Sequence, residues 1–471
     1  MRQTLDELRN TFVSLWHGAA ALRDEDWRIY SPGEQGESEG RLRAFVDLLS
    51  VDARCARDAG VAGRDAQDRL LAGFIAFVCP TLGWDRRSLE GLLEEFPPAM
   101  DQFRLEARRF DPSLSAADIY QGARNAITML CLQRLLGVAV GVTPAVLGYS
   151  LLYPYTDNFL DDASIGKAAK AAFVARFGDR LAGRRVDPAD RLEAHVFGLV
   201  ESIEGQYPRD RYPQVFDALL AIHAAQLRSV ALLASPTPRD VIEIAVEKGG
   251  TSVLADGYLV AGTLTRAQAE CLYGLGVFLQ LRDDLEDLAD DRRRKQATVF
   301  SSLRWYRRLD DPTMRTLAIG RAVLDRLETF EAPSARLVRD LMTKSLLLTI
   351  TDAAASAARR YSRSFREMLE RHSPFRFAFL IEQRRRVSRA QGSFTGMLEA
   401  WVAPGAPGLK TPGPQEREGS GLGLPEREMW APGLQAGPPA RQPRWGAETR
   451  GVPHLWTRGT RTFRPGAPAQ S

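Results

Sequence analysis

The amino-acid sequence predicts a large all-α bundle, and three observations support this fold class. Apolar residues recur at the helical period in nearly every stretch from residue 4 to residue 390, and one such stripe contains Leu5, Leu8 and Phe12. The sequence contains no alternating run of β-branched residues bounded by hairpin turns. Helix start signals are frequent, including Asp111-Pro112-Ser113 and Pro236-Thr237-Pro238. We therefore expect about a dozen or more helices, several of them longer than about 20 residues.

One uncharged segment, from Leu135 to Tyr155, is long enough to be considered as a membrane helix. Its 21 residues match the length of a transmembrane span. Helix-breaking residues interrupt it, namely Gly137, Gly141, Pro144 and Gly148, and an acidic cluster follows. We therefore expect a pair of buried central helices here and no transmembrane segment.

Composition divides the chain into three parts. We expect an N-terminal helical region at residues 1–112 and a helical catalytic core at residues 113–390. Residues 403–471 contain 12 Pro and 12 Gly among 69 residues, a composition that indicates a disordered tail without a catalytic role. A frame-shifted or otherwise non-native C-terminus is a hypothesis that this composition leaves open.

The charge distribution argues against a nucleic-acid-binding protein. The chain has 63 basic and 59 acidic residues, a net charge of +4. Nine basic and five acidic residues lie after position 402, which leaves 54 of each before it, so the basic excess belongs to the tail. The run from Arg292 to Lys295 follows an acidic cluster, and we interpret it mainly as a solvated helix end. A role in closing over a diphosphate is the second interpretation.

Other residue patterns exclude further classes. The four cysteines are widely spaced without a Cys-x-x-Cys pair, which is typical of a reducing cytosol. The five histidines show no spacing suited to zinc. The N-terminal segment carries acidic residues where a signal peptide needs an apolar run, so we expect a cytoplasmic protein.

Two acidic clusters, about 125 residues apart, carry the strongest chemical signal. Asp157 and Asp161 stand at i and i+4 in the first cluster, and Asp283 and Asp287 repeat this spacing in the second. Each pair therefore shares one face of a helix. Both clusters follow apolar helix-forming stretches, and carboxylates at the ends of buried helices are unfavourable unless cations neutralise them.

Magnesium is the cation that such carboxylates favour. Mg²⁺ binds one or two carboxylates, retains several waters and bridges to substrate phosphates. Two clusters on facing helices could hold several Mg²⁺ ions over a diphosphate. The competing interpretation is a pair of solvated acidic helix faces, which either cluster alone would favour. Both clusters together favour metal.

The two acidic motifs resemble those of trans-prenyl diphosphate synthases. The segment Gln280–Asp287, with the pattern Q-x-x-D-D-x-x-D, resembles their second aspartate-rich motif. The segment Asp157–Asp161 resembles their first motif, with Asn158 in place of the usual second Asp. It is also similar to the motif of bacterial large-terpene synthases, although Pro154 stands where their leading Asp would be.

Two further segments extend this resemblance to roughly residues 115–370. Lys248-Gly249-Gly250-Thr251 is similar to the family's lysine–threonine segment, about 30 residues before the second motif. The stretch Gly122–Asn125, which contains Arg124, resembles the glycine–lysine–arginine stretch near the start of those enzymes. The paired motifs are more specific than either one alone.

The resemblance implies a class I isoprenoid synthase, an all-α bundle with a central active-site cavity between the aspartate clusters. Such an enzyme binds three Mg²⁺ ions and a prenyl diphosphate, whose diphosphate departs to leave an allylic carbocation. The implied metal ligands are Asp157, Asp161, Asp283, Asp284 and Asp287, with Asn158 and Asp162 as further members. The implied substrate-binding residues are Arg124, Lys167, Lys248, Thr251 and Gln280. The residues expected to act in catalysis are Asp157, Asp161, Asp283, Asp284 and Lys248.

Aromatic side chains near the motifs have two interpretations. Aromatic faces stabilise a carbocation through their quadrupole. The candidates for lining the cavity are Tyr153, Phe159, Tyr258 and Phe278. Simple core packing is the more common role for each of them.

Departures from the family pattern leave three functions open. Ala123 and Ala126 replace basic residues, and Lys167 alone remains of a basic pair, so the second substrate site is depleted. This favours a synthase that ionises one allylic diphosphate. The Asp-rich second motif instead favours chain elongation with isopentenyl diphosphate, in which case Tyr153 resembles the residue that limits product length. Asn158 and the depleted basic stretch also fit a non-catalytic helical partner of an active synthase. The oligomeric state, including a homodimer, stays open.

Overall fold

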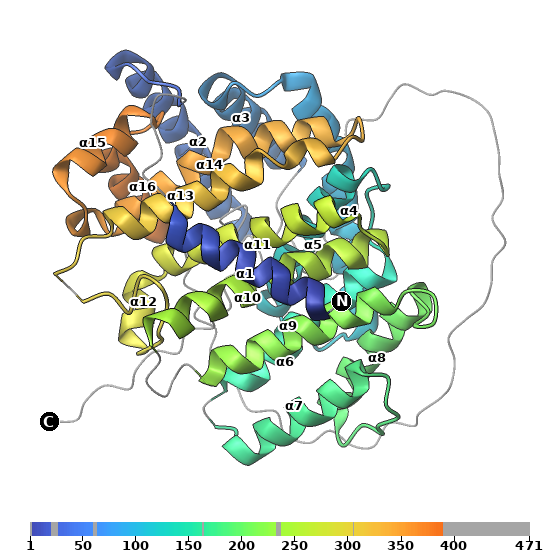
Figure 1. Cartoon of the computed structure of the whole chain (residues 1–471). Coiled ribbons are helices and arrows are strands. Elements are labelled where there is room, and N and C mark those ends of the chain that lie inside the picture. The colour runs from blue at the N-terminus through green and yellow to red at the C-terminus, as the bar shows by residue number, and fades with distance from the viewer. Residues whose placement is uncertain are drawn as a thin grey trace, which may run out of the picture.

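The chain folds into a bundle of α-helices (Figure 1). The computed structural model describes residues 2–19, 27–59, 64–162, 164–231, 237–304 and 306–389. These residues form sixteen α-helices and no strand, which confirms the predicted all-α bundle. In chain order the helices are α1 (Arg2–Gly18), α2 (Pro32–Ala59), α3 (Arg64–Leu82), α4 (Arg86–Phe110), α5 (Ala116–Leu136), α6 (Pro144–Asp161), α7 (Lys167–Leu181), α8 (Arg191–Gln206), α9 (Pro213–Ala231), α10 (Pro238–Ala261), α11 (Arg266–Glu286), α12 (Leu288–Arg293), α13 (Asp310–Leu324), α14 (Ala335–Ser356), α15 (Arg363–Arg371) and α16 (Phe377–Arg389), with the 3₁₀ helices η3 (Leu327–Thr329) and η4 (Ala358–Arg360) before α14 and α15.

Side-chain caps start the helices that carry the predicted motifs. Ser115 caps α5 and forms a capping box with Asp118, and Thr237 caps α10 in the same way with Asp240. These boxes satisfy backbone N–H groups that the first helical turn leaves without partners. Gly137 ends α5 in the left-handed conformation, at φ 72°. The uncharged segment from residue 135 to residue 155 is therefore divided between α5 and α6, as the sequence predicts. None of the helices that the structure describes is long and apolar enough to cross a membrane.

The centre of the bundle is a direct backbone contact between α10 and α11. A Cβ atom added at Gly276 would lie 2.1 Å from the carbonyl oxygen of Gly249, and one at Gly249 would lie 2.5 Å from that of Gly276. Next to this contact, the ring of Tyr273 covers Gly250 so closely that a Cβ atom there would lie 2.3 Å from it. Two helices that both have glycine at their crossing point can approach more closely than helices with larger residues there. The glycines of the Lys248–Thr251 segment therefore have a packing role.

The other helices surround this central pair. Helix α1 crosses in front of α10 and α11 in Figure 1, and Phe12 stacks on Tyr273 with their ring centroids 5.8 Å apart. Helices α5, α6 and α8 pack in succession on one side, while α13 and α14 pack against α11. Helix α7 lies at one edge against α8 and α9.

One large apolar core spans the predicted boundary at residue 112. It includes Phe12 of α1 and Phe103 of α4 together with residues of the later helices. A smaller cluster joins Ile75, Val78 and Leu89 in α3 and α4. The assignment of residues 1–112 and 113–390 to separate parts stays a prediction, and residues 403–471 lie outside the described part of the chain.

The glycine contact gives a test of the fold. Gly276→Ala should lower the free energy of unfolding by at least about 2 kcal/mol, because its Cβ atom would collide with the backbone of α10, which cannot move aside. Chemical denaturation measures this change. Gly91→Ala in α4 is the matched control, since its Cβ atom would meet nothing within 4 Å. The control should stabilise the protein by up to about 1 kcal/mol. Equal effects of the two substitutions would contradict the packing described.

Candidate functional site

The second acidic cluster lies where α11 ends and α12 begins. Asp283 and Asp284 occupy the last turn of α11 and are 8% and 5% exposed. Asp287 is the residue between the two helices, and its backbone N–H donates to the carbonyl oxygen of Asp283 at 2.8 Å. Asp291 in α12 is 1% exposed. Three buried carboxylates thus gather around one helix junction, an arrangement that desolvation disfavours without compensating charge.

Asp283 has one cation beside it in the sequence and another across the bundle. Its Oδ1 accepts a hydrogen bond from Nη1 of Arg282 at 2.9 Å. Burial raises the pKa of Asp283 to about 7, with smaller contributions from Glu286 and Asp287, while Arg282 and Arg124 oppose the rise. Arg124 belongs to α5, so the predicted substrate-binding arginine faces the second acidic cluster.

Asp284 is in a similar environment on the neighbouring face. Its Oδ1 accepts a hydrogen bond from Nε2 of Gln280 at 2.8 Å, one helical turn earlier. Burial raises the pKa of Asp284 to about 7, and the charge of Asp291 adds to the rise. The hydrogen bond from Gln280 and the charge of Lys248 oppose it. Lys248 and Gln280, both predicted to bind substrate, therefore lie beside a predicted metal ligand.

A chain of charged side chains links Asp283 to the C-terminal helix. Arg282 is 3% exposed and bonds Asp283 through one nitrogen and Glu286 through another. Glu286 contacts Arg384 of α16 at 3.4 Å, and Arg384 pairs with both carboxylate oxygens of Asp352 in α14. Burial makes each ion depend on its partner, because breaking one pair leaves an uncompensated charge. Helices α11, α14 and α16 thus fix the position of Arg282 against Asp283.

The first acidic cluster is at the end of α6. Asp157 is half-buried, and Nδ2 of Asn158 donates to Oδ1 of Asp118 in α5 at 2.9 Å. Asp162 accepts hydrogen bonds from the backbone and hydroxyl groups of Ser164, at 2.8 and 2.7 Å. The side chain of Asp161 lies outside the described part of the structure. Asn158 therefore has a partner on another helix, and Asp162 has a local one.

Helix α5 lies beside both acidic clusters. Its Asp118 accepts the hydrogen bond from Asn158, whereas its Arg124 faces Asp283. These two residues of α5 are six positions apart, which is about 9 Å along a helix.

Helix α10 makes a second connection between the clusters. The hydroxyl groups of Tyr153 in α6 and Ser252 in α10 are 3.4 Å apart, and Lys248, which faces Asp284, lies one turn from Ser252. The structure thus places α6 against α5 and α10, and α11 against α10, while Arg124 of α5 faces Asp283 of α11.

The remaining predicted substrate-binding residues lie in different surroundings. Lys167 is exposed at the first position of α7. Its neighbour Lys170 instead donates to the carbonyl oxygen of Leu160, near the end of α6. Thr251 is 2% exposed, and its hydroxyl donates to the carbonyl oxygen of Glu247 in its own helix. In the described structure Thr251 therefore bonds within its own helix, α10, and Lys170 bonds the end of α6 next to the first acidic cluster.

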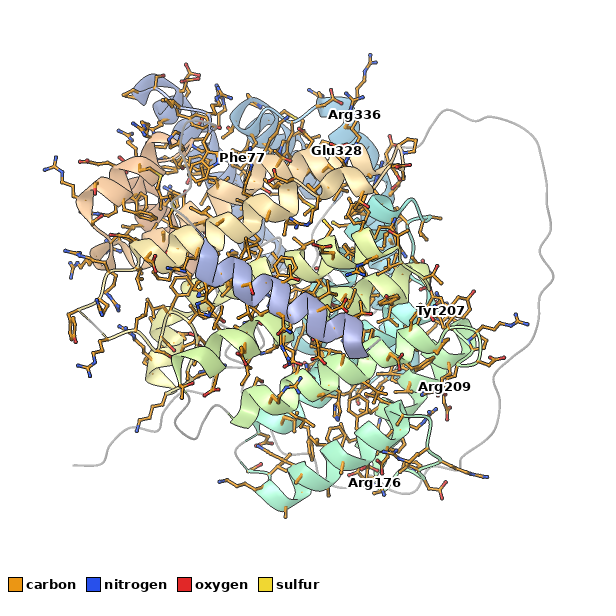
Figure 2. All side chains as sticks on the ribbon, viewed as in Figure 1. Phe77, Arg176, Tyr207, Arg209, Glu328 and Arg336 are labelled. Carbon is orange, nitrogen blue, oxygen red and sulfur yellow. The ribbon has the colours of Figure 1, made fainter. Side chains whose placement is uncertain are left out.

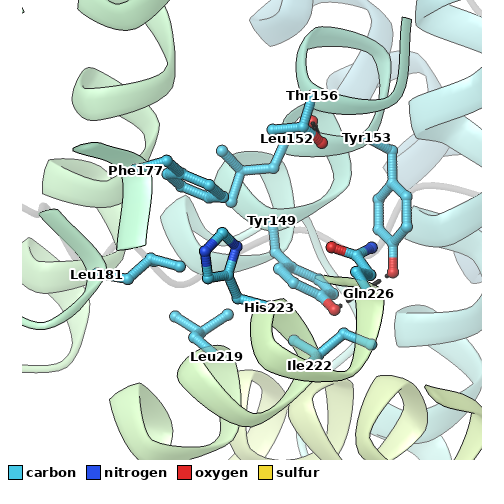
Figure 3. A pocket seen from close by; sticks show the side chains of 10 residues that line it. All are labelled: Tyr149, Leu152, Tyr153, Thr156, Phe177, Leu181, Leu219, Ile222, His223 and Gln226. Carbon is cyan, nitrogen blue, oxygen red and sulfur yellow. Dashed lines mark hydrogen bonds between the residues drawn. The ribbon is translucent and has the colours of Figure 1, made fainter. Parts of the chain in front are cut away.

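A mostly apolar pocket adjoins the first acidic cluster (Figure 3). This open pocket lies between α6, α7 and α9, and its empty space of about 360 Å³ includes open solvent. Tyr149 and Tyr153 form one side, and the hydroxyl of Tyr153 donates to that of Tyr149 at 3.2 Å. Phe177 and His223 meet edge to face, with ring centroids 5.1 Å apart. Asp157 directly follows the lining residue Thr156, so the pocket and the first cluster share one turn of α6.

Two of the other predicted lining residues belong to the main core. Tyr258 and Phe278 are 8% and 5% exposed there. Phe159 packs on Phe173 of α7, with ring centroids 4.8 Å apart. Of the four aromatic candidates, Tyr153 lines the pocket described above.

The oxygen donors of the two clusters suit a hard cation, but they are dispersed. Among the residues that the structure describes, no three His, Cys, Asp or Glu side chains stand close enough together to hold one ion. Arg282 and Gln280 bond Asp283 and Asp284 in this arrangement. Asp283 and Asp284 nevertheless suit a cation such as Mg²⁺, because a bound cation would favour their ionised forms against the burial that raises their pKa values.

Sequence reasoning missed three residues of this site. Asp291 stands at i+4 from Asp287, and the spacing rule that selected the other aspartates could have found it. Arg282 could have been found as the i, i+4 partner of Glu286. Arg384 lies 98 residues after Glu286, and no local sequence spacing predicts their contact.

Comparisons with known proteins add little beyond these observations. No protein-family model matches the chain, and no curated protein matches it either. Among solved structures, the chain is similar to a geranyltransferase from Legionella pneumophila, with 12% sequence identity and a TM-score of 0.35. The match covers 56% of this chain and 99% of the geranyltransferase chain.

The burial of Asp284 predicts a pH-dependent gain in stability when its charge is removed. Because its pKa is raised from 3.8 to about 7, the stability of the metal-free protein should fall as the pH rises through that window. Asp284→Asn keeps the oxygen that accepts from Gln280 but cannot ionise. At pH 8 it should raise the free energy of unfolding by up to about 4 kcal/mol, and at pH 4 it should change it little. Urea denaturation with EDTA present measures both values. A gain that is independent of pH would contradict the burial described.

Proposed function

We propose that this protein is a Mg²⁺-dependent class I isoprenoid synthase that ionises an allylic prenyl diphosphate. The observation that carries the proposal is the buried pair Asp283 and Asp284, which faces Arg124 from α5 and Lys248 from α10. Four residues that were selected from motif patterns alone thus act on one another electrostatically. A surplus of buried carboxylates beside two fixed cations suits a site for metal ions and an anionic leaving group.

Each cluster would contribute metal ligands of its own. Asp283, Asp284 and Asp287, together with Asp291, would hold metal from α11 and α12, while Asp157, Asp161 and the neighbouring Asn158 and Asp162 would do so from α6. We expect three ions in all. When bound, Mg²⁺ neutralises the charge that builds on the departing diphosphate.

The protein's own cations and aromatic side chains supply the rest of the chemistry. Arg124 and Lys248 are held by helices and offer fixed positive charge to the leaving group without reorganisation. The mostly apolar lining of the pocket beside Asp157 would shield part of a hydrocarbon chain from water. The ring faces of Tyr149 and Tyr153 can stabilise a carbocation there.

Chain elongation with isopentenyl diphosphate is the second candidate function. Tyr153 lines the pocket one turn before Asp157, which is where a residue that limits product length would act. Against elongation, Lys167 is exposed at the start of α7, so the depleted second substrate site gains no obvious cation from it.

One assay separates these functions. The purified protein is incubated with Mg²⁺ and C10 to C25 prenyl diphosphates, with and without isopentenyl diphosphate, and diphosphate release is measured. Release without isopentenyl diphosphate supports ionisation of a single substrate, as in lyase or cyclase chemistry. Release only in its presence supports prenyl transfer by elongation. Absence of release with every substrate overturns both and leaves the non-catalytic partner.

Removing the charge of Asp283 should abolish turnover while the fold persists. Asp283→Asn keeps the acceptor for Arg282, and we expect diphosphate release to fall by at least about 10³-fold because a metal ligand is lost. Circular dichroism should show unchanged helicity. Asp311→Asn at an exposed position of α13 is the control and should retain wild-type rates. Wild-type turnover by Asp283→Asn would refute the site assignment.

The charged chain to α16 predicts a positioning role for Arg384. Arg384→Met removes the partner that Glu286 and Asp352 share, so Arg282 should hold Asp283 less firmly. We expect the Mg²⁺ concentration for half-maximal activity to rise by about 10-fold.

A second substitution in α16 separates this role from a general effect on the helix. Arg386→Met is the matched control, because Arg386 pairs with Asp47 of α2 and lies outside the charged chain. The control should keep the wild-type Mg²⁺ dependence. Identical dependence in both variants would contradict a positioning role for Arg384.

A further inference from the structure

Two neighbouring segments and a third about 50 residues later in the sequence meet to form a cluster of basic side chains. They are the end of α12 with the turn after it, the connection before α13, and η4. We call this cluster the basic patch, and its members are Arg292, Arg293, Arg294, Lys295, Arg304, Arg307, Arg308, Arg359 and Arg360. Figure 1 shows α12 on the same side of the molecule as α15 and α16, and Figure 2 shows nitrogen-tipped side chains projecting from that side.

Some of these arginines hold the segments together through carbonyl oxygens. Nη2 of Arg292 donates to the carbonyl oxygen of Leu303 at 2.6 Å. Nη2 of Arg360 donates to those of Arg304 and Arg307, at 3.1 and 2.9 Å.

Arg308 connects the segment before α13 to η4 and the residue after it. Its Nη1 donates to the carbonyl oxygens of Tyr361 and Arg359, at 2.8 and 3.3 Å. A carbonyl group satisfies a guanidinium donor but carries no net negative charge, so these contacts leave the positive charge of the patch in place.

Other members of the patch are available to a partner. Arg294, Lys295, Arg307 and Arg359 are exposed, and within the described residues their side chains make no hydrogen bond or ion pair. The basic patch contains one ion pair with a carboxylate in the described structure, between Arg293 and Asp290. Burial lowers the pKa of Arg360, and the charge of Arg292 lowers it further, which shows that like charges are close. The patch is therefore a concentrated positive charge in which, among the described residues, Asp290 alone pairs with one of its members.

An exposed aromatic ring lies within the same surface. Tyr306 is 56% exposed, and its hydroxyl accepts a hydrogen bond from Arg304 at 3.1 Å. Tyrosine combines an apolar ring with a polar tip, and it is enriched where a protein meets the headgroup region of a bilayer.

We propose that the basic patch docks this protein onto an anionic membrane surface. Basic residues near an anionic bilayer each add roughly 5-fold to the affinity, and four available residues can give reversible attachment. The proposal is independent of the proposed function, and it adds a partner to it. A nucleic acid fits less well, because residues 1–402 carry no net charge to attract a long polyanion.

Vesicle sedimentation of the full-length protein tests the proposal. The vesicles contain phosphatidylcholine alone or with about one third phosphatidylglycerol. The variant Arg294→Gln, Lys295→Gln, Arg307→Gln and Arg359→Gln removes four charges without removing a described hydrogen bond. The matched control removes four exposed charges elsewhere, through Arg87→Gln, Arg185→Gln, Arg211→Gln and Arg336→Gln. Both variants keep the basic tail, so the tail cannot account for a difference between them.

We expect wild-type protein and the control to bind the anionic vesicles and not the neutral ones. The patch variant should bind them roughly 600-fold more weakly, and about 0.5 M NaCl should release the wild type. Circular dichroism checks that both variants fold. Failure of the wild type to bind, or equal binding by patch variant and control, overturns the proposal. Patch-dependent binding of a single-stranded oligonucleotide without vesicle binding also overturns it, in favour of a nucleic acid.

Discussion

The contact between α10 and α11 is the constraint on which the rest of this structure depends. Gly249 and Gly276 let the two backbones touch, and any Cβ atom at either position would collide with main-chain atoms. Lys248 directly precedes one of these glycines, and Gln280 lies one turn after the other. The contact therefore fixes the register that brings Lys248 beside Asp284. Glycines in a motif that resembles a substrate-binding segment thus act first through packing, and they position the chemistry as a consequence.

Burial of the second acidic cluster lowers the stability of the metal-free fold, but it suits the proposed metal-dependent function. Asp283 and Asp284 lie under a cover of protein that raises both pKa values to about 7, so the ionised forms destabilise the metal-free fold. A chain under selection for stability alone would replace them with neutral residues. Their partners are polar and specific: Arg282 is itself buried and is tied through Glu286 and Arg384 to two further helices. Such a network holds carboxylates ready for a cation, and this is the physical reason for proposing a metal-dependent reaction.

The sequence predicted the fold class because the signals for it are local. Helical periodicity and start signals act within a few residues: Thr237 of the second predicted signal caps α10, and α5 begins shortly after the first, with Ser115 as its cap. Local spacing also selected Asp283, and the motif resemblance selected Asp284, Lys248 and Arg124; the structure describes interactions of all four.

Contacts across the bundle could not be predicted in the same way. Asn158 bonds Asp118 of another helix, and Arg384 reaches Glu286 from nearly a hundred residues away. The periodicity of the sequence does not indicate such pairs, because they depend on how whole helices pack. The metal ligands themselves stay predictions, since the described side chains form no group of three around one point.

Arginine has two opposite roles in this molecule, and the acceptor atom decides between them. Inside the bundle, Arg282 and Arg384 bind carboxylates, so each charge is cancelled and the pairs add rigidity. At the edge near α12, Arg308 and Arg360 bind carbonyl oxygens, so the loops are ordered while the charge stays. A loop that needed only order could use neutral donors for these carbonyl groups. Retaining several guanidinium groups there concentrates positive charge beside the exposed ring of Tyr306, and an anionic surface is the partner that such a combination suits.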